Sequence, residues 1–338
     1  MKSFKCSCTE TFKGLFFFID SRYFSSLNPA MLNLRFKIYL PVLFSIGTLL
    51  DACSPTKKES TITSLRDVTG ITFIETRREF DTGLSFSQYG FQQVPEWTLR
   101  FLPGDSVEIY SPYEKKFLGY PIYYDHHDVV NFAREWLRIK HVSKDSLVLQ
   151  LLVVKSKQVL KNMSTVYMKF YSEDYIKNRL KSNSESLRKP NRRDSLFVKS
   201  LIKRANSHPG NSDSVFFARI PVKMKSLTPD ITVQKDLPAN NSIYYRASNE
   251  YWNPEYTITI DNAYKDFGHS FTAFVDSSGR MTVSKFAVSD PDFDAPRRRV
   301  LQGIIDVYLH RYLKITPGTT FGIPHSCEIM LHVSGKKY

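Results

Sequence analysis

The chain has 338 residues, of which 42% are hydrophobic and 14% aromatic, enough for two modest folded domains or one large one. It carries 47 Lys and Arg against 33 Asp and Glu, a net charge of +14. This charge fits a solvated basic face first, and an anionic membrane or surface glycan second. The sequence contains no zinc-finger or RNP pattern, so we expect no nucleic-acid partner.

The N-terminal region contains the pattern of a secretion signal. Arg35 and Lys37 precede an apolar stretch over 38–50, which is too short for a membrane-spanning helix of about 20 residues. Asp51 ends the stretch, and a polar segment follows from Ser54. The pattern predicts export and cleavage, with Met31 as the true start of translation.

Leu50, Asp51, Ala52 and Cys53 resemble the lipobox of bacterial lipoproteins. Leu50 and Ala52 match the family pattern, whereas Asp51 stands where a small uncharged residue is usual. The resemblance implies cleavage after Ala52 and lipidation of Cys53. It implies an envelope protein anchored by lipid at the outer membrane, facing the periplasm or the cell surface. The alternatives are an ordinary signal peptide, or a buried helix that ends near a chance cysteine.

Composition shifts along the chain predict six segments. They are an upstream segment 1–30 that is mis-annotated, a signal peptide 31–52, a tether 53–70, a β-rich domain 71–176, a basic linker with a helical part 177–213, and a C-terminal domain 214–338.

Residues 71–176 show short strand patterns separated by turns. We expect strands over 97–102, 107–110, 117–124, 136–139, 147–153 and 166–171, which form an antiparallel β meander closed as a barrel or sandwich. The strand led by Trp97 and the Trp136 to Asp145 pattern are similar to lipocalin-like domains of exported proteins. This resemblance implies a small apolar ligand inside the domain. The alternative is a filled domain without a cavity.

The basic segment 177–213 predicts a short helix over 194–205, either a solvated helix or one that meets a phosphate-bearing surface. Strand patterns return after it, and we expect them over 215–220, 231–233, 243–246 and 256–260.

The last 70 residues predict a β-β-α-β unit. Strands over 271–275 and 281–288 flank a tight turn in which Gly279 suits a positive φ. Asp292 or Asp294 is expected to cap the following helix, with Pro296 in its first turn. A final strand begins at Cys327, which we expect to be a small core residue.

Pro317, Gly318, Gly322 and Pro324 follow the spacing Pro-Gly-x-x-x-Gly-x-Pro. With the preceding unit, they make residues 268–333 resemble the C-terminal domain of TonB-like energy transducers, although Ile315 stands at the usual Trp position. The resemblance implies an α+β fold, mostly β, that pairs with an extended segment of an envelope protein at a sheet edge. A full TonB role is not expected, because it requires an uncleaved membrane helix.

Catalytic patterns are missing from the sequence, since nucleophile-elbow, zinc-protease and P-loop motifs do not occur. His126 and His127 are adjacent and suit a polar loop better than a metal site. We therefore expect no cofactor, no metal and no enzyme activity. The leading interpretation is a membrane-anchored lipoprotein that mediates protein interaction in envelope transport or maintenance. The alternative is a lipocalin-like binder of a small apolar ligand.

Overall fold

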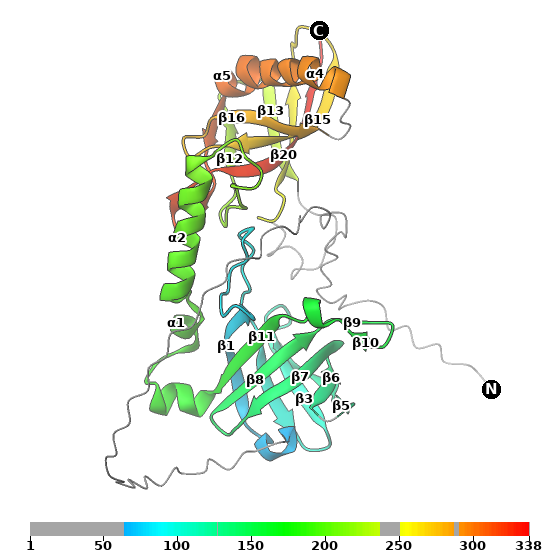
Figure 1. Cartoon of the computed structure of the whole chain (residues 1–338), viewed down its shortest axis with the longest axis vertical. Helices are drawn as coiled ribbons and strands as arrows, with labels where there is room; N and C mark the ends of the chain where they lie inside the picture. Colours follow the sequence, from blue (N-terminus) through cyan, green and yellow to red (C-terminus); the bar gives the residue numbers. More distant parts are fainter. Residues whose placement is uncertain (1–63, 127, 237–250, 287–290, 338) are drawn as a thin grey trace, which may run out of the picture. The chain divides into compact units, whose positions relative to one another are not determined.

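The computed structural model describes residues 64–126, 128–236, 251–286 and 291–337. The protein is mostly β, with 43% strand and 22% helix (Figure 1). Ala52, Cys53, the signal segment and the strand expected over 243–246 lie outside the described residues. Among the residues that are described, no helix has the length and apolar character needed to cross a bilayer.

The N-terminal half forms a nine-stranded antiparallel sheet in the order β4-β3-β2-β1-β11-β8-β7-β6-β5. Its strands are β1 (Thr72–Phe80), β2 (Thr98–Leu102), β3 (Ser106–Ser111), β4 (Lys116–Pro121), β5 (Tyr123–Tyr124), β6 (Val129–Phe132), β7 (Glu135–Val142), β8 (Ser146–Leu152) and β11 (Val166–Ser172). A short hairpin of β9 (Val154–Lys155) and β10 (Gln158–Val159) and a 3-10 turn, η3 (Lys161–Met163), precede β11.

The sheet is nearly closed, because its two edge strands are neighbours in the chain. β4 ends and β5 begins on either side of Ile122, whose backbone N–H donates to the Asp105 carbonyl at 2.7 Å. The strand expected over 117–124 is therefore split by a bend that lets its two halves pair with β3 and β6. The expected meander is present.

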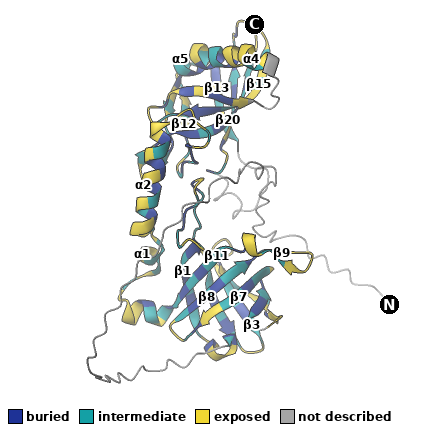
Figure 2. Cartoon of the chain, viewed as in Figure 1, coloured by how far each residue is buried: buried dark blue, intermediate teal, exposed yellow. Residues whose placement is uncertain are grey.

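Nearly every strand of this sheet carries buried residues, drawn dark blue in Figure 2, and their side chains form one hydrophobic core. Phe73, Phe101, Leu137 and Phe170 are among its buried members. Residues 65–68, at the end of the expected tether, form the 3-10 turn η2 (Leu65–Val68), whose two terminal side chains are buried in the same core.

In the chain, a mainly helical segment connects the strands of the N-terminal sheet to those of the C-terminal half. It contains the π-helical turn η4 (Tyr175–Arg179), α1 (Ser184–Arg188) and α2 (Arg192–Ser207). The expected helix over 194–205 is present and slightly longer, because Asn191 and Asp194 form a capping box that starts it earlier. Its buried face, which includes Val198 and Leu201, packs on Phe86 and Phe216.

The strand expected over 215–220 does not form. This stretch is extended but makes only one isolated bridge, between Ile220 and Thr319. Its apolar side chains are buried by packing instead: Val215 and Ala218 are buried, and Phe216 stacks on His325. The apolar residues of 215–220 therefore indicate burial, and they do not indicate a strand that pairs within a sheet.

The C-terminal half is built on a five-stranded sheet in the order β13-β14-β20-β15-β16. Its strands are β13 (Ile231–Asp236), β14 (Glu255–Ile260), β15 (Phe267–Val275), β16 (Met281–Phe286) and β20 (Cys327–Gly335). Two small sheets accompany it: β12 (Lys223–Ser226) with β17 (Leu313–Thr316), and β18 (Thr319–Thr320) with β19 (Ile323–Pro324). β20 is central, parallel to β14 and antiparallel to β15.

One continuous helical run links β16 to β17. It consists of α4 (Pro291–Ile304), the π-helical turn η5 (Ile305–Leu309) and α5 (His310–Tyr312). The run begins at Pro291, so Asp292 and Asp294 are inside the helix and neither precedes it, and Pro296 is beyond the first turn. The sequence interpretation was wrong here because Pro291 is itself suited to the first helical position.

The inner face of this run packs on the sheet. Leu301, Ile305 and Leu309 are buried against β-strand residues such as Phe271 and Leu331. Cys327, at the start of β20, is a free, buried thiol in this core. Thus the β-β-α-β order expected for 268–333 is present, within a sheet that also contains β13 and β14.

Candidate interaction site at the edges of the C-terminal sheet

The two edges of the five-stranded sheet are β13 and β16. An edge strand presents backbone N–H and C=O groups that need partners, and it is therefore the natural place for another strand to add. The two edges of this sheet differ in how those groups are used.

The β16 edge is bonded by side chains from α4. Arg298 donates to the carbonyls of Val283 and Ser284 at 2.6 and 2.9 Å, and the side-chain oxygen of Gln302 accepts from the Val283 N–H at 3.1 Å. A charged guanidinium on two carbonyls is a strong interaction. An incoming strand would have to displace it.

His310 closes the start of the same strand. Its Nε2 accepts from the Met281 N–H at 2.8 Å, so Nδ1 carries the proton and donates to Asp306 at 3.2 Å. Asp306 also accepts from Gln302 at 2.9 Å. The side chains that bond to β16 are therefore linked to one another along the helix, and they close this edge.

β13 is the opposite edge. It pairs antiparallel with β14 from Ile231 to Asp236. Thr232 and Gln234 are exposed, whereas Ile231 is buried and Val233 half-buried, as expected of a strand with one face on the core. The side chains that bond to β16 are on the opposite edge of the sheet from β13.

The turn between β15 and β16 is fixed by Asp276 and Gly279. The Asp276 carboxylate accepts from the Ser278 and Arg280 N–H groups at 2.8 and 2.9 Å. Burial raises its pKa, but these hydrogen bonds and that from the Ser278 hydroxyl outweigh burial and hold it below the usual range. Gly279 has φ +89°, and a Cβ there would lie 2.7 Å from the Ile315 carbonyl. This turn therefore packs directly on β17.

The Pro-Gly-x-x-x-Gly-x-Pro segment forms a miniature hairpin of β18 and β19. Phe321 and Gly322 occupy its turn with φ +54° and +74°, the combination that a type I′ turn requires. Gly318 has a different role, because a Cβ there would lie 2.5 Å from Ala218 Cβ. Pro324 ends β19, and its carbonyl accepts from Asn206 at 3.2 Å.

A buried histidine follows this hairpin. The His325 ring stacks on Phe216 with centroids 3.9 Å apart and planes 6° from parallel. Nδ1 donates to the Ser326 carbonyl at 3.1 Å, and Nε2 accepts from the Thr320 hydroxyl at 2.9 Å. Burial lowers the pKa of His325 to about 4, against the opposing effect of the Ser326 carbonyl. Sequence analysis missed this residue, because a lone histidine beside a Pro-Gly motif gives no signal of burial.

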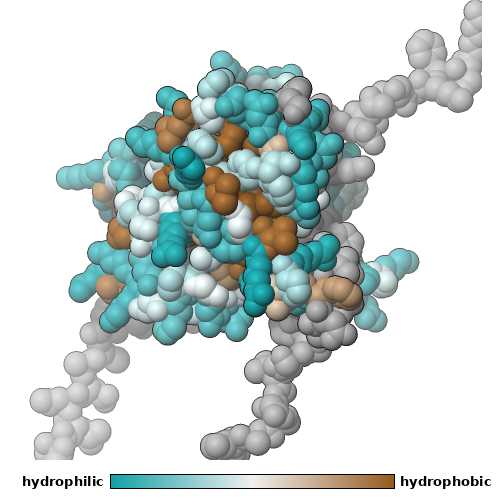
Figure 3. All heavy atoms as spheres, turned by 90° about the horizontal axis from the view of Figure 1, so that it is seen from above, coloured by the Kyte–Doolittle hydropathy of each residue, from teal (hydrophilic) through white to brown (hydrophobic). Residues whose placement is uncertain are grey.

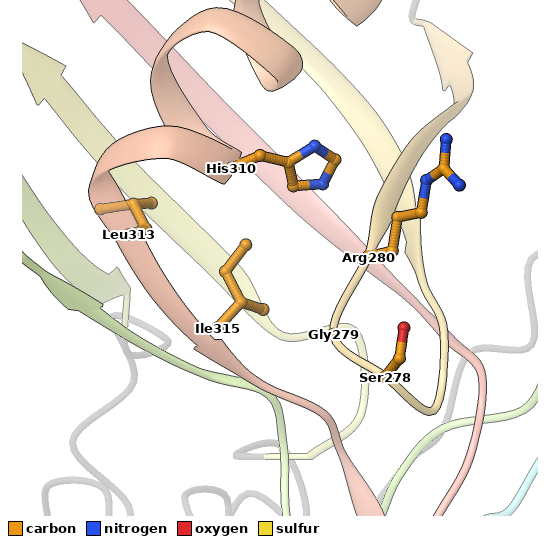
Figure 4. Close-up of a pocket in the computed structure, with 6 residues that line it drawn as sticks. All are labelled: Ser278, Gly279, Arg280, His310, Leu313 and Ile315. Atoms are coloured by element: carbon orange, nitrogen blue, oxygen red, sulfur yellow. The ribbon is translucent and has the colours of Figure 1, made fainter.

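A hollow of about 500 Å³ opens at the β15–β16 turn (Figure 4). It is lined by Ser278, Gly279, Arg280, His310, Leu313 and Ile315. The Ser278 hydroxyl donates to Asp276 at 2.6 Å, and both His310 nitrogens are hydrogen-bonded as described. The hydroxyl and the imidazole thus serve the turn and the sheet edge, and they do not form a nucleophile–base pair.

The N-terminal sheet buries a charged pair together with its apolar core. Arg78 donates to Glu75 twice, at 2.7 and 2.8 Å, and Glu75 also accepts from the N–H groups of Glu96 and Trp97. Burial raises the pKa of nearby Glu135 to about 7, with the Arg78 charge acting in the opposite direction. Glu75 and Arg78 thus satisfy each other beside the apolar core of the sheet.

The histidine pair considered and set aside as a metal site comes just before β6 in the chain. His126 is exposed and bonds to Asp125 at 2.7 Å, and His127 lies outside the described residues. Among the residues that the structure covers, no three His, Cys, Asp or Glu side chains are grouped as metal ligands. The glycines and prolines of the C-terminal motif serve turns and close packing.

Comparison with known proteins gives no assignment. No protein-family model matches the chain. No curated protein matches it either.

Proposed function

We propose that this chain is a non-enzymatic lipoprotein, anchored at the envelope through Cys53, whose TonB-like C-terminal module binds another envelope protein by pairing at the β13 edge. The observation that carries the proposal is the asymmetry of the five-stranded sheet. Arg298, Gln302 and His310 bond to the β16 backbone, so a partner strand would meet competition there, whereas within the described ranges the backbone hydrogen bonds of β13 go to β14.

The interior of the N-terminal sheet supports protein interaction over capture of a small apolar ligand. Phe73, Phe101, Leu137 and Phe170 belong to one continuous core inside the sheet, and a ligand there would have to displace such side chains. The commitment of Ser278 and His310 to structural hydrogen bonds supports a non-enzymatic role.

The test places a photo-crosslinking amino acid on each edge of the sheet in the full chain, expressed in its own cells. Exposed positions Thr232 and Gln234 report on β13, and exposed Thr282 and Lys285 are matched controls on β16. We expect one discrete cross-linked envelope protein from the β13 positions only. Equal cross-linking from both edges, or from neither, would contradict pairing at β13.

The anchor is tested separately by metabolic labelling with a radioactive fatty acid. The wild-type chain should be labelled and a Cys53→Ser variant should not. A labelled Cys53→Ser variant would exclude lipidation at this residue, whatever the crosslinking shows.

A further inference from the structure

The outer face of the helical run Pro291–Tyr312 carries large apolar side chains in water. Phe293 is 66% exposed, Val300 48% and Val307 55%. Figure 3, which views the C-terminal domain from the side of this helix, shows apolar side chains gathered among hydrophilic ones. The inner face of the same helix already packs on the sheet, so this outer stripe is a second apolar face.

The stripe has the spacing of a helix-pairing seam. Phe293 and Val300 are seven residues apart in α4, Pro296 and Gly303 each lie three residues after them, and exposed Val307 continues the face in the π-helical turn η5. Positions separated alternately by three and four residues form the a and d seam of a coiled coil. Gly303 lies in the middle, where a small residue lets a second helix approach closely. These five residues are called the outer seam.

The charges beside the outer seam complement one another. Arg299 and Asp306 directly precede Val300 and Val307, so they lie on one flank, while Arg311 lies on the other. In an antiparallel pair of identical helices, Asp306 faces Arg299 of the second helix. In a parallel pair, Asp306 faces Arg311 of the second helix. In either direction an acidic group meets a basic one.

Asp306 is held ready for such a contact. Its side chain is 56% exposed, and hydrogen bonds to Gln302 and His310 fix its position on the helix. The self-complementary pattern fits a second copy of the same chain.

We propose that the outer seam pairs with the outer seam of a second copy, making the chain a helix-mediated homodimer. This interface is separate from the β13 edge, so it leaves that edge available for another protein. Its seam spans little more than two heptads, which makes the dimer weak and concentration-dependent.

The test is sedimentation velocity on the full chain over a wide range of protein concentration, with Cys53→Ser in every sample so that lipid makes no contribution. The parent should show reversible dimerisation. Val300→Glu should weaken it about ten-fold or more by placing a charge in the seam. Leu196→Glu is the matched control, because Leu196 is 58% exposed on α2 and lies outside the seam.

Charge exchange then tests the flank. Asp306→Arg should weaken the dimer, and adding either Arg299→Asp or Arg311→Asp should restore it, the first if the helices are antiparallel and the second if they are parallel. Circular dichroism checks that each variant is folded. A parent that stays monomeric, or a dimer equally insensitive to Val300→Glu and Leu196→Glu, overturns the proposal.

Discussion

The buried imidazole of His325 should make the folded state sensitive to mild acid. Its Nε2 accepts from the Thr320 hydroxyl, which in turn accepts from the Arg219 N–H at 3.2 Å. Protonation at Nε2 would set a donor against this hydroxyl and bury a charge beside Phe216. The folded state therefore holds His325 neutral.

The size of the effect follows from the two pKa values. An unfolded histidine titrates near 6.5, whereas burial lowers the pKa of folded His325 to about 4. Because the folded pKa is the lower one, this contribution to stability is complete above pH 6.5 and is lost as the pH falls toward 4. Between pH 7.5 and 4.5 the loss is about 2.5 kcal/mol, at 1.36 kcal/mol for each pKa unit.

The assay is urea denaturation at pH 7.5 and 4.5 for the wild type and His325→Phe, which keeps the ring stack and cannot titrate. The variant should start less stable at pH 7.5, because Ser326 and Thr320 lose a partner, but it should lose about 2.5 kcal/mol less on acidification. His126→Gln, at an exposed histidine, should follow the wild type. Equal acid losses in the wild type and His325→Phe would refute the reasoning.

Two further predictions concern stability. Burial raises the pKa of Glu135 to about 7, so this carboxyl destabilises the fold increasingly as the pH rises from about 4.5 to 7. Glu135→Gln should therefore stabilise the fold by about 2.5 kcal/mol more at pH 8 than at pH 5. An equal gain at both pH values would contradict a buried carboxyl. Gly318→Ala should lower the free energy of unfolding, measured by urea denaturation, by about 2 kcal/mol, because its Cβ would lie 2.5 Å from Ala218 Cβ. Gly210→Ala is the control and should lower it much less, because open space surrounds Gly210. Equal losses would contradict the close approach at Gly318.

Turn chemistry and alternating apolar residues made much of the fold predictable. The hairpin of β2 and β3, the tight turn at Gly279 and the helix of the C-terminal unit follow from patterns only a few residues long. Short patterns of this kind act locally.

The strand β1 could not be recognised in this way, although it lies in the middle of the N-terminal sheet. Its Glu75, Arg77, Arg78 and Glu79 read as a charged surface stretch. In the fold they are paired: Glu75 with Arg78, Arg77 with Asp194 more than 100 residues away, and Glu79 with Lys169. A charge can be buried when a partner arrives from elsewhere in the chain, and the sequence does not show which partner that is.

The difference between the β13 and β16 edges could not be predicted from the sequence for the same reason. The sequence predicts a helix after β16, but not that Arg298, Gln302 and His310 reach back to the strand's backbone. That depends on the angle at which the helix crosses the sheet, which is set by packing. The outer seam could not be told from the core face in the sequence, and it became apparent only once Leu301 and Ile305 were seen to face the core.

The central place of β20 has a consequence for how the C-terminal sheet comes into being. Both of its long neighbours, β14 and β15, must wait for the last strand of the chain. The pairing of residues 255–260 with 330–335 closes a loop of some 70 residues, which is slow compared with hairpin formation. A growing chain thus cannot complete this sheet until residue 335 has been made, and loss of β20 alone would leave two separate hairpins, β13–β14 and β15–β16, in place of one sheet.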